Sequence, residues 1–233
     1  IEQHCAAPTT LAIASLDESG SASYQFLICG TSSLSVTPEI ALAAVNPSAV
    51  AVHIGTLALI FEPLSSATRA VVSAMGEDQL LMMDPNARPS VMDDPTQFWE
   101  SFNTSLDRAD VIKVSGDDLD YMFPSLSHVD AARQIHEQSS AVVLFTDGSK
   151  SVRVFGEGAQ FDCDVPKIEV VDTVGAGDSF SGGFLSYWDT RNWTRRDTRD
   201  VEKIRSAVQF GISVAAVTCQ RAGAMPPLAN ELG

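Results

Sequence analysis

The chain has 233 residues, of which 45% are hydrophobic and 19% charged, which is typical of a globular protein able to bury a full core. Its formal net charge of −15 argues against nucleic acid or an anionic membrane as partner, because both bind clustered lysine and arginine. No apolar run approaches the roughly 20 residues that span a bilayer, and the first residues lack a signal-peptide pattern, so we expect a cytoplasmic protein.

The first predicted element is a β-hairpin over residues 10–28. Apolar side chains alternate along both arms, around a polar turn at residues 17–20. These side chains are Leu11, Ile13, Tyr24, Phe26 and Ile28. The hairpin stands apart from the helical patterns that follow, so we expect a small flap on a larger body.

From residue 49 onward, strand-like and helix-like patterns alternate, as in a parallel sheet with helices on both faces. The expected strands cover residues 50–54, 80–83, 111–114, 141–145, 152–155 and 168–171. The expected helices cover about 65–75, 95–106, 117–122, 129–138 and 200–218, and one more begins close to residue 178. The sequence therefore predicts one α/β domain over 1–233, with a doubly wound, mostly parallel sheet in a body at 49–233.

A glycine-rich turn connects the strand predicted at 168–171 to the helix that begins close to Asp178. Gly175 and Gly177 flank the small Ala176, so the backbone can bring the unpaired N–H groups of a helix start up to an anion. Asp178 is open to two interpretations. It either stabilises the helix N-terminus, or it accepts the proton of an attacking hydroxyl while the amides hold a transferring phosphoryl group.

The string Asp-Thr-Val-Gly-Ala-Gly-Asp at residues 172–178 resembles the signature of the ribokinase-like, or PfkB, family of carbohydrate kinases. The resemblance implies that Asp178 is the catalytic base and that Gly175, Ala176 and Gly177 form the anion hole. It also implies an ATP-dependent kinase, most similar to bacterial fructokinases, that transfers the γ-phosphoryl group to fructose or a similar small sugar. ATP and Mg²⁺ are the implied cofactors, and K⁺ is a further candidate.

A second polar segment, Asp-Pro-Asn-Ala-Arg, follows the predicted strand at 80–83. Taken alone it describes a proline-stiffened turn with a solvated arginine, or a loop that turns Asn86 and Arg88 toward phosphates. The segment resembles the Asp-Pro-Asn-x-Arg segment of bacterial fructokinases. The resemblance implies that Arg88 joins the catalytic residues and that Asn86 lies near the metal and phosphates.

A third segment, residues 115–118, follows the predicted strand at 111–114. Ser115 with acids after it is explained fully by helix capping. The family often has Asn-x-x-Glu here, a motif linked to Mg²⁺ and phosphates, and this chain has Ser115 and Asp118 in those places. The resemblance implies that Asp118 acts on the metal through water.

The resemblance also implies that four further positions border the nucleotide: Thr146, Gly148, Thr173 and Gly223. Gly223 by itself indicates only a helix C-cap. The resemblance also implies a monovalent cation held by carbonyls near Asp172 and Val174. His53 ends a predicted strand and is interpreted as a structural histidine, and the four scattered cysteines are expected to be reduced thiols.

The resemblance covers nearly the whole chain, but relatives open with a strand that carries a sugar-binding aspartate and then a Gly-Gly and asparagine segment. Nothing before Thr10 matches these parts, so we expect an incomplete or a shortened member. Ribose, 2-keto-3-deoxygluconate or a nucleoside are alternative acceptors. A non-catalytic, nucleotide-binding regulatory protein is the alternative of a different class. In the family a β-sheet lid covers the sugar, and such lids often pair across a two-fold axis. The resemblance therefore implies that the hairpin is part of a lid at residues 10–37 and that the chain forms a homodimer through it.

Overall fold

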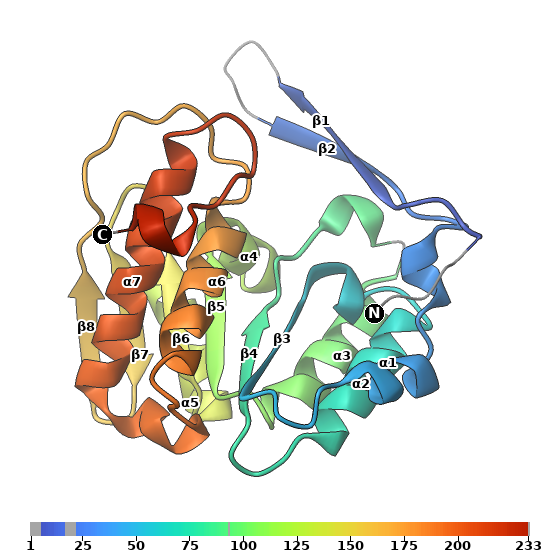
Figure 1. Ribbon diagram of the computed structural model, residues 1–233, viewed down its shortest axis with the longest axis horizontal. Helices are drawn as coiled ribbons and strands as arrows, with labels where there is room; N and C mark the ends of the chain where they lie inside the picture. Colours follow the sequence, from blue (N-terminus) through green and yellow to red (C-terminus); the bar gives the residue numbers. More distant parts are fainter. Residues whose placement is uncertain (1–5, 17–21, 93, 233) are drawn as a thin grey trace.

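The computed structural model describes residues 6–16, 22–92 and 94–232, and its centre is a six-stranded sheet (Figure 1). The strand order is β3-β4-β5-β6-β7-β8. Pairs from β3 to β6 are parallel, and β7 and β8 add two antiparallel pairs at one edge. The strands are β3 (Ala51–Gly55), β4 (Leu80–Asp84), β5 (Val111–Ser115), β6 (Val142–Thr146), β7 (Val152–Gly156) and β8 (Ala159–Cys163).

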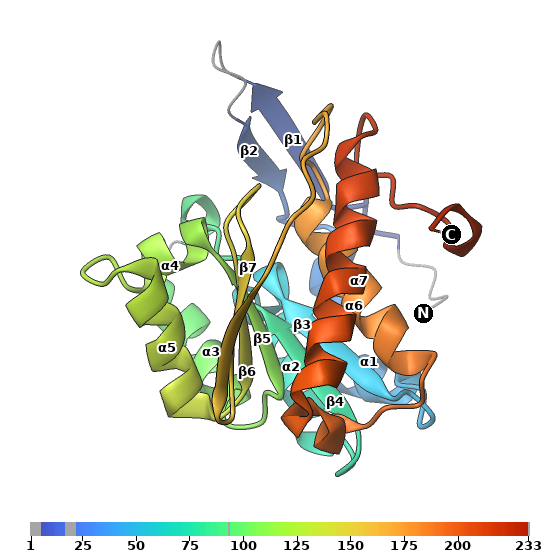
Figure 2. The same ribbon diagram turned by 90° about the vertical axis from the view of Figure 1, so that its left-hand side faces the viewer.

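Helices cover both faces of this sheet, so the predicted doubly wound α/β fold is confirmed. They are α1 (Pro38–Ala44), α2 (Leu64–Ala74), α3 (Pro95–Leu106), α4 (Gly116–Met122), α5 (His128–Ser139), α6 (Ala176–Asp189) and α7 (Val201–Cys219). Figure 2 shows α6 and α7 on one side of the sheet and α4 and α5 on the other. Within the described ranges, no helix is both long and apolar enough to cross a membrane.

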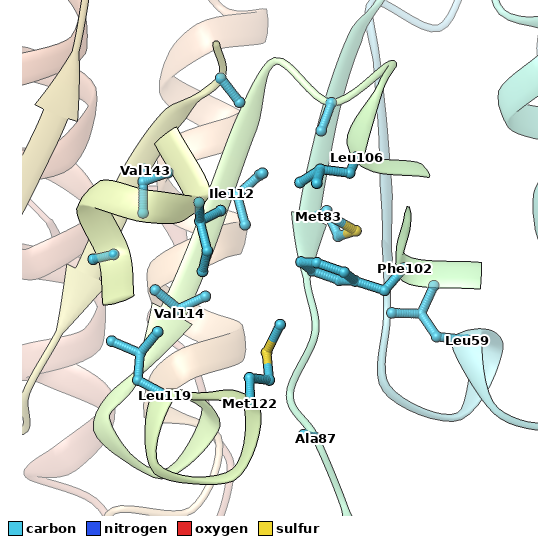
Figure 3. Close-up of a cluster of buried hydrophobic side chains, with 14 of the residues drawn as sticks. Leu59, Met83, Ala87, Phe102, Leu106, Ile112, Val114, Leu119, Met122 and Val143 are labelled. Carbon is cyan, nitrogen blue, oxygen red and sulfur yellow. The ribbon is translucent and has the colours of Figure 1, made fainter. Parts of the chain in front are cut away.

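Two apolar cores lie on the two faces because side chains alternate along each strand. Leu81 and Met83 of β4 join the core under α2 to α5, whereas Leu80 and Met82 join the core under α6 and α7. Figure 3 shows the first core, in which Met83 lies near Phe102 of α3. All these strand side chains are fully buried, as expected for a mostly parallel sheet covered on both faces.

The predicted hairpin is present as β1 (Leu11–Leu16) and β2 (Ala22–Leu27), which pair antiparallel with Leu11 opposite Leu27. Its predicted turn at residues 17–20 lies outside the described residues. Both views show the hairpin standing away from the central sheet (Figures 1 and 2). Its role as a lid over a sugar remains a prediction.

One predicted strand is wrong. Residues 168–171 form no strand, since Val170 and Val171 are exposed and the Val171 N–H donates to the carbonyl of Cys219 at the end of α7. The strand that completes the sheet is β8, which follows a tight turn at Gly158, and the sequence prediction missed it. The short helix α1 was also missed. The bounds of the other predicted elements agree closely with the structure.

Two glycines let α6 and α7 approach each other closely. A Cβ on Gly211 would lie 2.8 Å from the Phe180 carbonyl oxygen, and one on Gly183 would lie 2.8 Å from a Val214 methyl carbon. The Thr218 hydroxyl adds a buried hydrogen bond of 2.9 Å to Ser179 Oγ. Glycine at both positions therefore fixes α6 against α7, and with it the glycine-rich turn from which α6 begins.

Candidate active site

Four polar side chains lie at or near the ends of four neighbouring strands, on the face covered by α6 and α7. They are His53, Asp84, Lys113 and Thr146, from β3, β4, β5 and β6 respectively. The residues two positions earlier, such as Met82 and Leu144, belong to the core under α6 and α7. Strand alternation therefore points the polar groups to the same face, at the carboxyl edge where open α/β sheets bind ligands.

Lys113 and Asp84 form a buried ion pair in this row. The distance from Lys113 Nζ to Asp84 Oδ2 is 2.6 Å, and the residues are 5% and 3% exposed. The other carboxylate oxygen, Oδ1, has no hydrogen-bond partner among the described residues. Burial raises the pKa of Asp84, and the neighbouring ammonium opposes that rise.

His53 lies beside this pair on the edge strand and remains open to solvent. Partial burial lowers the pKa of its imidazole, on which the charges of Asp84, Lys113 and Asp178 also act. The four groups are therefore within electrostatic reach of one another. The side chain faces this cluster and not a closed core, so its surroundings do not by themselves support the interpretation of His53 as a structural residue.

The glycine-rich turn lies directly over the ion pair. Gly175 has a φ of 76°, in the left-handed region, and its Cβ would meet the Ala224 side chain at 2.7 Å. A Cβ on Gly177 would lie 3.1 Å from Lys113 Nζ. Position 175 therefore requires glycine for both conformation and space, whereas a Cβ at position 177 would make a tight contact that Lys113 would have to shift to accommodate.

The amides of this turn are not all available for a ligand. The N–H of Ala176 donates to the Thr173 carbonyl at 3.2 Å. In the part of the chain that the structure describes, no acceptor is found for the amides of Gly175, Gly177 or Asp178. The predicted set of Gly175, Ala176 and Gly177 thus lies in one turn, but the Ala176 amide already has a partner and the Asp178 amide does not.

Asp178 occupies the first turn of α6, and its side chain is exposed and forms no hydrogen bond with a described residue. A carboxylate that merely capped the helix would accept from a backbone N–H of that turn. The side chain is instead left open, beside unpaired N–H groups that favour an anion. Chemically, the arrangement offers a general base next to an anion-binding turn.

The loop after β4 is held in an unusual backbone conformation. Asn86 has a φ of 40° and Thr56 a φ of 51°, which is rare for residues with a side chain and most unusual for a β-branched threonine. Asn86 Nδ2 donates to Thr56 Oγ1 at 3.0 Å, and the Thr56 N–H donates to the Pro85 carbonyl at 3.1 Å. Arg88 donates only to backbone carbonyls, at 3.0 and 3.3 Å, and contacts no carboxylate of the described residues.

Asp118 is 2% exposed, and both its oxygens are occupied. Oδ2 accepts from the N–H and hydroxyl of Ser115 at 2.8 and 2.6 Å, completing a capping box at the start of α4. Oδ1 accepts from the Ala87 N–H at 2.7 Å. The carboxylate therefore ties the loop that carries Asn86 and Arg88 to the end of β5.

A second carboxylate joins the two loops beside α6. Asp172 accepts from the Val174 N–H at 3.0 Å and from the Gly223 N–H at 2.8 Å, and these hydrogen bonds hold its pKa below the usual value. Thr173 is exposed next to this link. The Asp172 side chain is thus occupied by amides, which leaves backbone carbonyls as the groups there that could bind a cation.

The remaining predicted nucleotide residues lie at the end of β6. The Thr146 hydroxyl donates to the Val114 carbonyl at 3.3 Å, and Gly148 has a φ of 55° with open space where a Cβ would stand. Both lie at the same sheet edge as the ion pair, because β6 runs parallel to β5. The structure therefore brings the residues predicted from sequence to one edge of the sheet.

Two of the hollows on the described surface differ in size and position. One, of about 490 Å³, is lined by Gly175, Asp178, residues of α6 and α7, and the segment 224–232. A larger one, of about 990 Å³, lies at the opposite edge of the sheet, around Asp110 and Arg195. No described cluster of three or more His, Cys, Asp or Glu side chains could hold a metal ion by itself.

Neither Lys113 nor Thr56 is among the site residues predicted from the sequence. Alternation in the strand at 111–114 could have indicated Lys113, because a lysine inside an apolar strand must be paired or functional. Nothing in the sequence indicates the left-handed conformation of Thr56. The partner of Lys113, Asp84, comes from a different strand, and only the strand order brings the two together.

Comparison with known proteins gives a consistent result. The sequence model described as pfkB family carbohydrate kinase matches residues 2–231. Probable fructokinase-2 of Arabidopsis thaliana is 27% identical over 228 residues, which are 97% of this chain and 68% of that protein.

Solved structures resemble the chain over the same extent. The fructokinase of Xylella fastidiosa with bound ATP superposes with a TM-score of 0.83 at 26% identity, covering 97% of this chain and 72% of that one. A fructokinase double mutant of Vibrio cholerae O395, bound to fructose, ADP and a potassium ion, superposes with a TM-score of 0.81 at 22% identity, covering 95% and 71%. The second of these comparisons shows the fold alone.

Proposed function

The chain belongs to the pfkB family of carbohydrate kinases, which transfer a phosphoryl group from ATP to a sugar, and we propose that fructose or a similar small sugar is its acceptor. One observation carries the assignment of the site. An exposed, unpaired Asp178 carboxylate lies in the same turn as the unpaired amides of Gly175 and Gly177. A base beside an anion-binding turn is what transfer to a hydroxyl requires.

In the proposed mechanism, Asp178 accepts the proton of a primary hydroxyl of the sugar as its oxygen attacks the γ-phosphorus. The amides of Gly175, Gly177 and Asp178 donate to the phosphoryl oxygens, on which charge builds up. Arg88, whose guanidinium contacts no described carboxylate, offsets further charge. Ala176 supplies the small side chain that the turn needs, since its own amide is occupied.

Mg²⁺ is the proposed companion of ATP, and when bound it would neutralise phosphate charge. Asp118 fits this ion only through water, because hydrogen bonds from Ala87 and Ser115 occupy its oxygens. Mg²⁺ suits such a site, since it keeps several waters and binds mainly to phosphates. Asn86 lies on the loop that Asp118 holds, and it is the second residue assigned near the metal.

The nucleotide is proposed to lie across Thr146, Gly148, Thr173 and Gly223. The hydrogen bonds of Asp172 to Val174 and Gly223 support this, because they fix the two loops on the adenine side relative to each other. The carbonyls of Asp172 and Val174 are proposed to hold K⁺. A fructokinase of the same fold, at 22% identity, was solved with a potassium ion.

The exposed apolar face of the hairpin supports a homodimer through the lid. Leu11 and Leu27 are opposite each other in the register, and Ile13 lies on the same face as Leu11. The exposed fractions of Leu11, Leu27 and Ile13 are 52%, 45% and 45%. A second copy would cover them, and light scattering across a range of protein concentrations tests this.

The test of the function is ADP release from ATP and Mg²⁺ with fructose, ribose, 2-keto-3-deoxygluconate and adenosine offered separately. Turnover is expected with fructose, and Asp178→Asn should lower kcat by about 10²- to 10⁴-fold while nucleotide binding persists. Asp189→Asn is the matched control, because Asp189 is an exposed acid at the other end of α6. Near-normal turnover by Asp178→Asn would remove Asp178 as the base.

A result with no turnover on any of the four acceptors, despite tight nucleotide binding, would favour a nucleotide-binding protein without kinase activity. Turnover on another acceptor alone would keep the kinase assignment and replace fructose. Binding is measured by calorimetry with AMP-PNP, so the two outcomes are separable.

A further inference from the structure

The buried pair of Lys113 and Asp84 is not explained by stability alone. Two charges removed from water are costly, and apolar residues of similar volume in their place are often neutral or stabilising. The pair is also incomplete. An ammonium has three donors, and Asp84 is the only described acceptor for Lys113, while Asp84 Oδ1 has no partner among the described residues.

The position of Lys113 makes the pair more unusual. Its Nζ lies where it would meet a Cβ on Gly177 at 3.1 Å, so the ammonium lies against the first turn of α6. The N-terminus of a helix already carries partial positive charge, and a cation there is unfavourable unless an anion compensates it. Asp84 supplies one negative charge on the sheet side, and the open side of the turn is left for another.

The surroundings make this charge effective at close range. Lys113 extends from β5 between core residues of the α6 face, and its 5% exposure excludes most water. Charge interactions are stronger in such a low-dielectric setting than at an exposed surface. The two remaining N–H donors of the Lys113 ammonium have no protein acceptor among the described residues. The contact at Gly177 places this ammonium beside the glycine-rich turn, whose own amides are unpaired.

We propose that Lys113, held by Asp84, is a positioning residue for phosphoryl transfer: it fixes the turn of Gly175 to Asp178 from the sheet side and adds positive charge behind the amides that face the transferring group. This inference rests on the proposed kinase function. It assigns Lys113 to the γ-phosphoryl position and not to nucleotide binding in general. Removing Lys113 should therefore weaken the binding of a nucleotide with a γ-phosphoryl group more than that of ADP.

The test compares the affinities of AMP-PNP and ADP, each with Mg²⁺, in the wild-type chain and in Lys113→Met. We expect the wild-type preference for AMP-PNP over ADP to fall by about tenfold in the variant. With the accepted sugar, kcat should fall by about a hundredfold while KM for the sugar changes little. A purely structural lysine would alter both nucleotide affinities equally, or neither.

A second variant separates the loss of function from misfolding. Lys113→Met combined with Asp84→Val removes the pair as a unit and leaves no buried, unpaired carboxylate. It should unfold no more easily than the wild type and show the same loss of preference. Arg108→Met is the matched control, since it breaks an ion pair with a buried aspartate at the other sheet edge. That variant should keep both the preference and kcat.

Three results would overturn the inference. The first is a folded double variant that keeps the preference for AMP-PNP and the wild-type kcat. The second is failure of both Lys113 variants to fold, which assigns the pair to stability. The third is a wild-type chain with equal, or no, affinity for the two nucleotides. Sugar turnover by the wild type is scored separately, so failure of the kinase function is distinguishable from failure of the role of Lys113.

Discussion

The central sheet buries an aspartate against a basic side chain at each end of its parallel strands: at the amino edge, where β3 to β6 begin, and at the carboxyl edge, where they end. The two aspartates differ in how completely their oxygens are hydrogen-bonded. At the amino edge, Asp110 Oδ2 accepts from the Leu81 N–H and Arg108, both within 2.8 Å, and Oδ1 accepts from Arg195 at 2.9 Å. At the carboxyl edge, Asp84 has Lys113 as its one described partner. A completed network stabilises a fold, whereas a buried, unpaired polar atom requires an explanation.

The volumes of the two hollows do not identify which edge carries the candidate active site. The larger hollow, of about 990 Å³, lies at the amino edge, but its three arginines are each paired with an acid. The pairs are Arg195 with Asp110, Arg196 with Asp78, and Arg199 with Glu157. At the carboxyl edge the groups without a described partner are amides of the glycine-rich turn, the Asp178 carboxylate and Asp84 Oδ1. Unpaired polar groups, and not volume, therefore distinguish the candidate active site.

Alanine substitution of one glycine at each edge is expected to give the largest difference between the two edges. A Cβ on Gly55 would lie 1.9 Å from the Asp84 carbonyl oxygen, so Gly55→Ala must force β3 and β4 apart at the site. We expect a loss of about 3 kcal/mol or more in the free energy of unfolding, together with loss of kinase activity. Urea denaturation and the ADP-release assay measure the two effects.

Gly158, at the amino edge, is the control. It has a φ of 71°, and no atom lies within 4 Å of the place that a Cβ would take. Gly158→Ala should therefore cost only backbone strain, about 1 kcal/mol, with unchanged kcat. Equal losses of stability in the two variants would contradict the difference in packing between the two edges.

Asp110→Asn tests the completed network. Every oxygen of Asp110 accepts a hydrogen bond, so an amide nitrogen in place of one oxygen would face a donor. We expect a loss of about 2 to 3 kcal/mol in the free energy of unfolding, with kcat unchanged at a temperature where the variant is folded. A tenfold fall in kcat would show that the amino edge also serves catalysis.

Asp118→Asn tests the link between the loop that carries Arg88 and the end of β5. The substituted amide would face the Ala87 or Ser115 N–H, so we expect a loss of about 1 to 2 kcal/mol and a roughly tenfold lower kcat/KM. Asp130→Asn is the matched control, because Asp130 makes similar capping contacts with Ser127 at the start of α5 but is exposed. It should leave kcat/KM unchanged, and an equal fall in both variants would contradict the proposed link.

Strand ends could be predicted from the sequence, and contacts between strands could not. The alternation in β4 and β5 places Asp84 and Lys113 at strand ends, but their pairing depends on the parallel register of β4 and β5. The local sequence pattern wrongly predicted a strand at residues 168–171. This β-branched run is held by a hydrogen bond to the end of α7 and not by a sheet. The capping role of Asp118 was predictable, whereas its hydrogen bond to Ala87, 31 residues away, depends on tertiary structure.

Glu62 lies after β3, at the carboxyl edge, but its carboxylate is fully paired, so it should affect stability and not catalysis. Burial raises its pKa, but hydrogen bonds from Ser65, Ser66 and Arg69 outweigh this and lower it to about 2. Since the folded pKa lies below the usual 4.5, the stabilisation is complete above pH 4.5 and is lost as the pH falls toward 2.

Glu62→Gln should therefore lower the free energy of unfolding near pH 7 by only about 0.5 kcal/mol, because the side chain is 43% exposed and solvent screens it. The difference from the wild type should shrink as the pH falls from about 5 to about 3 in urea denaturation. Glu100→Gln, at an exposed glutamate of α3 whose side chain has no described partner, should show no such trend. A fall in kcat for Glu62→Gln would mean that proximity to the carboxyl edge, and not incomplete pairing, decides which residues serve catalysis.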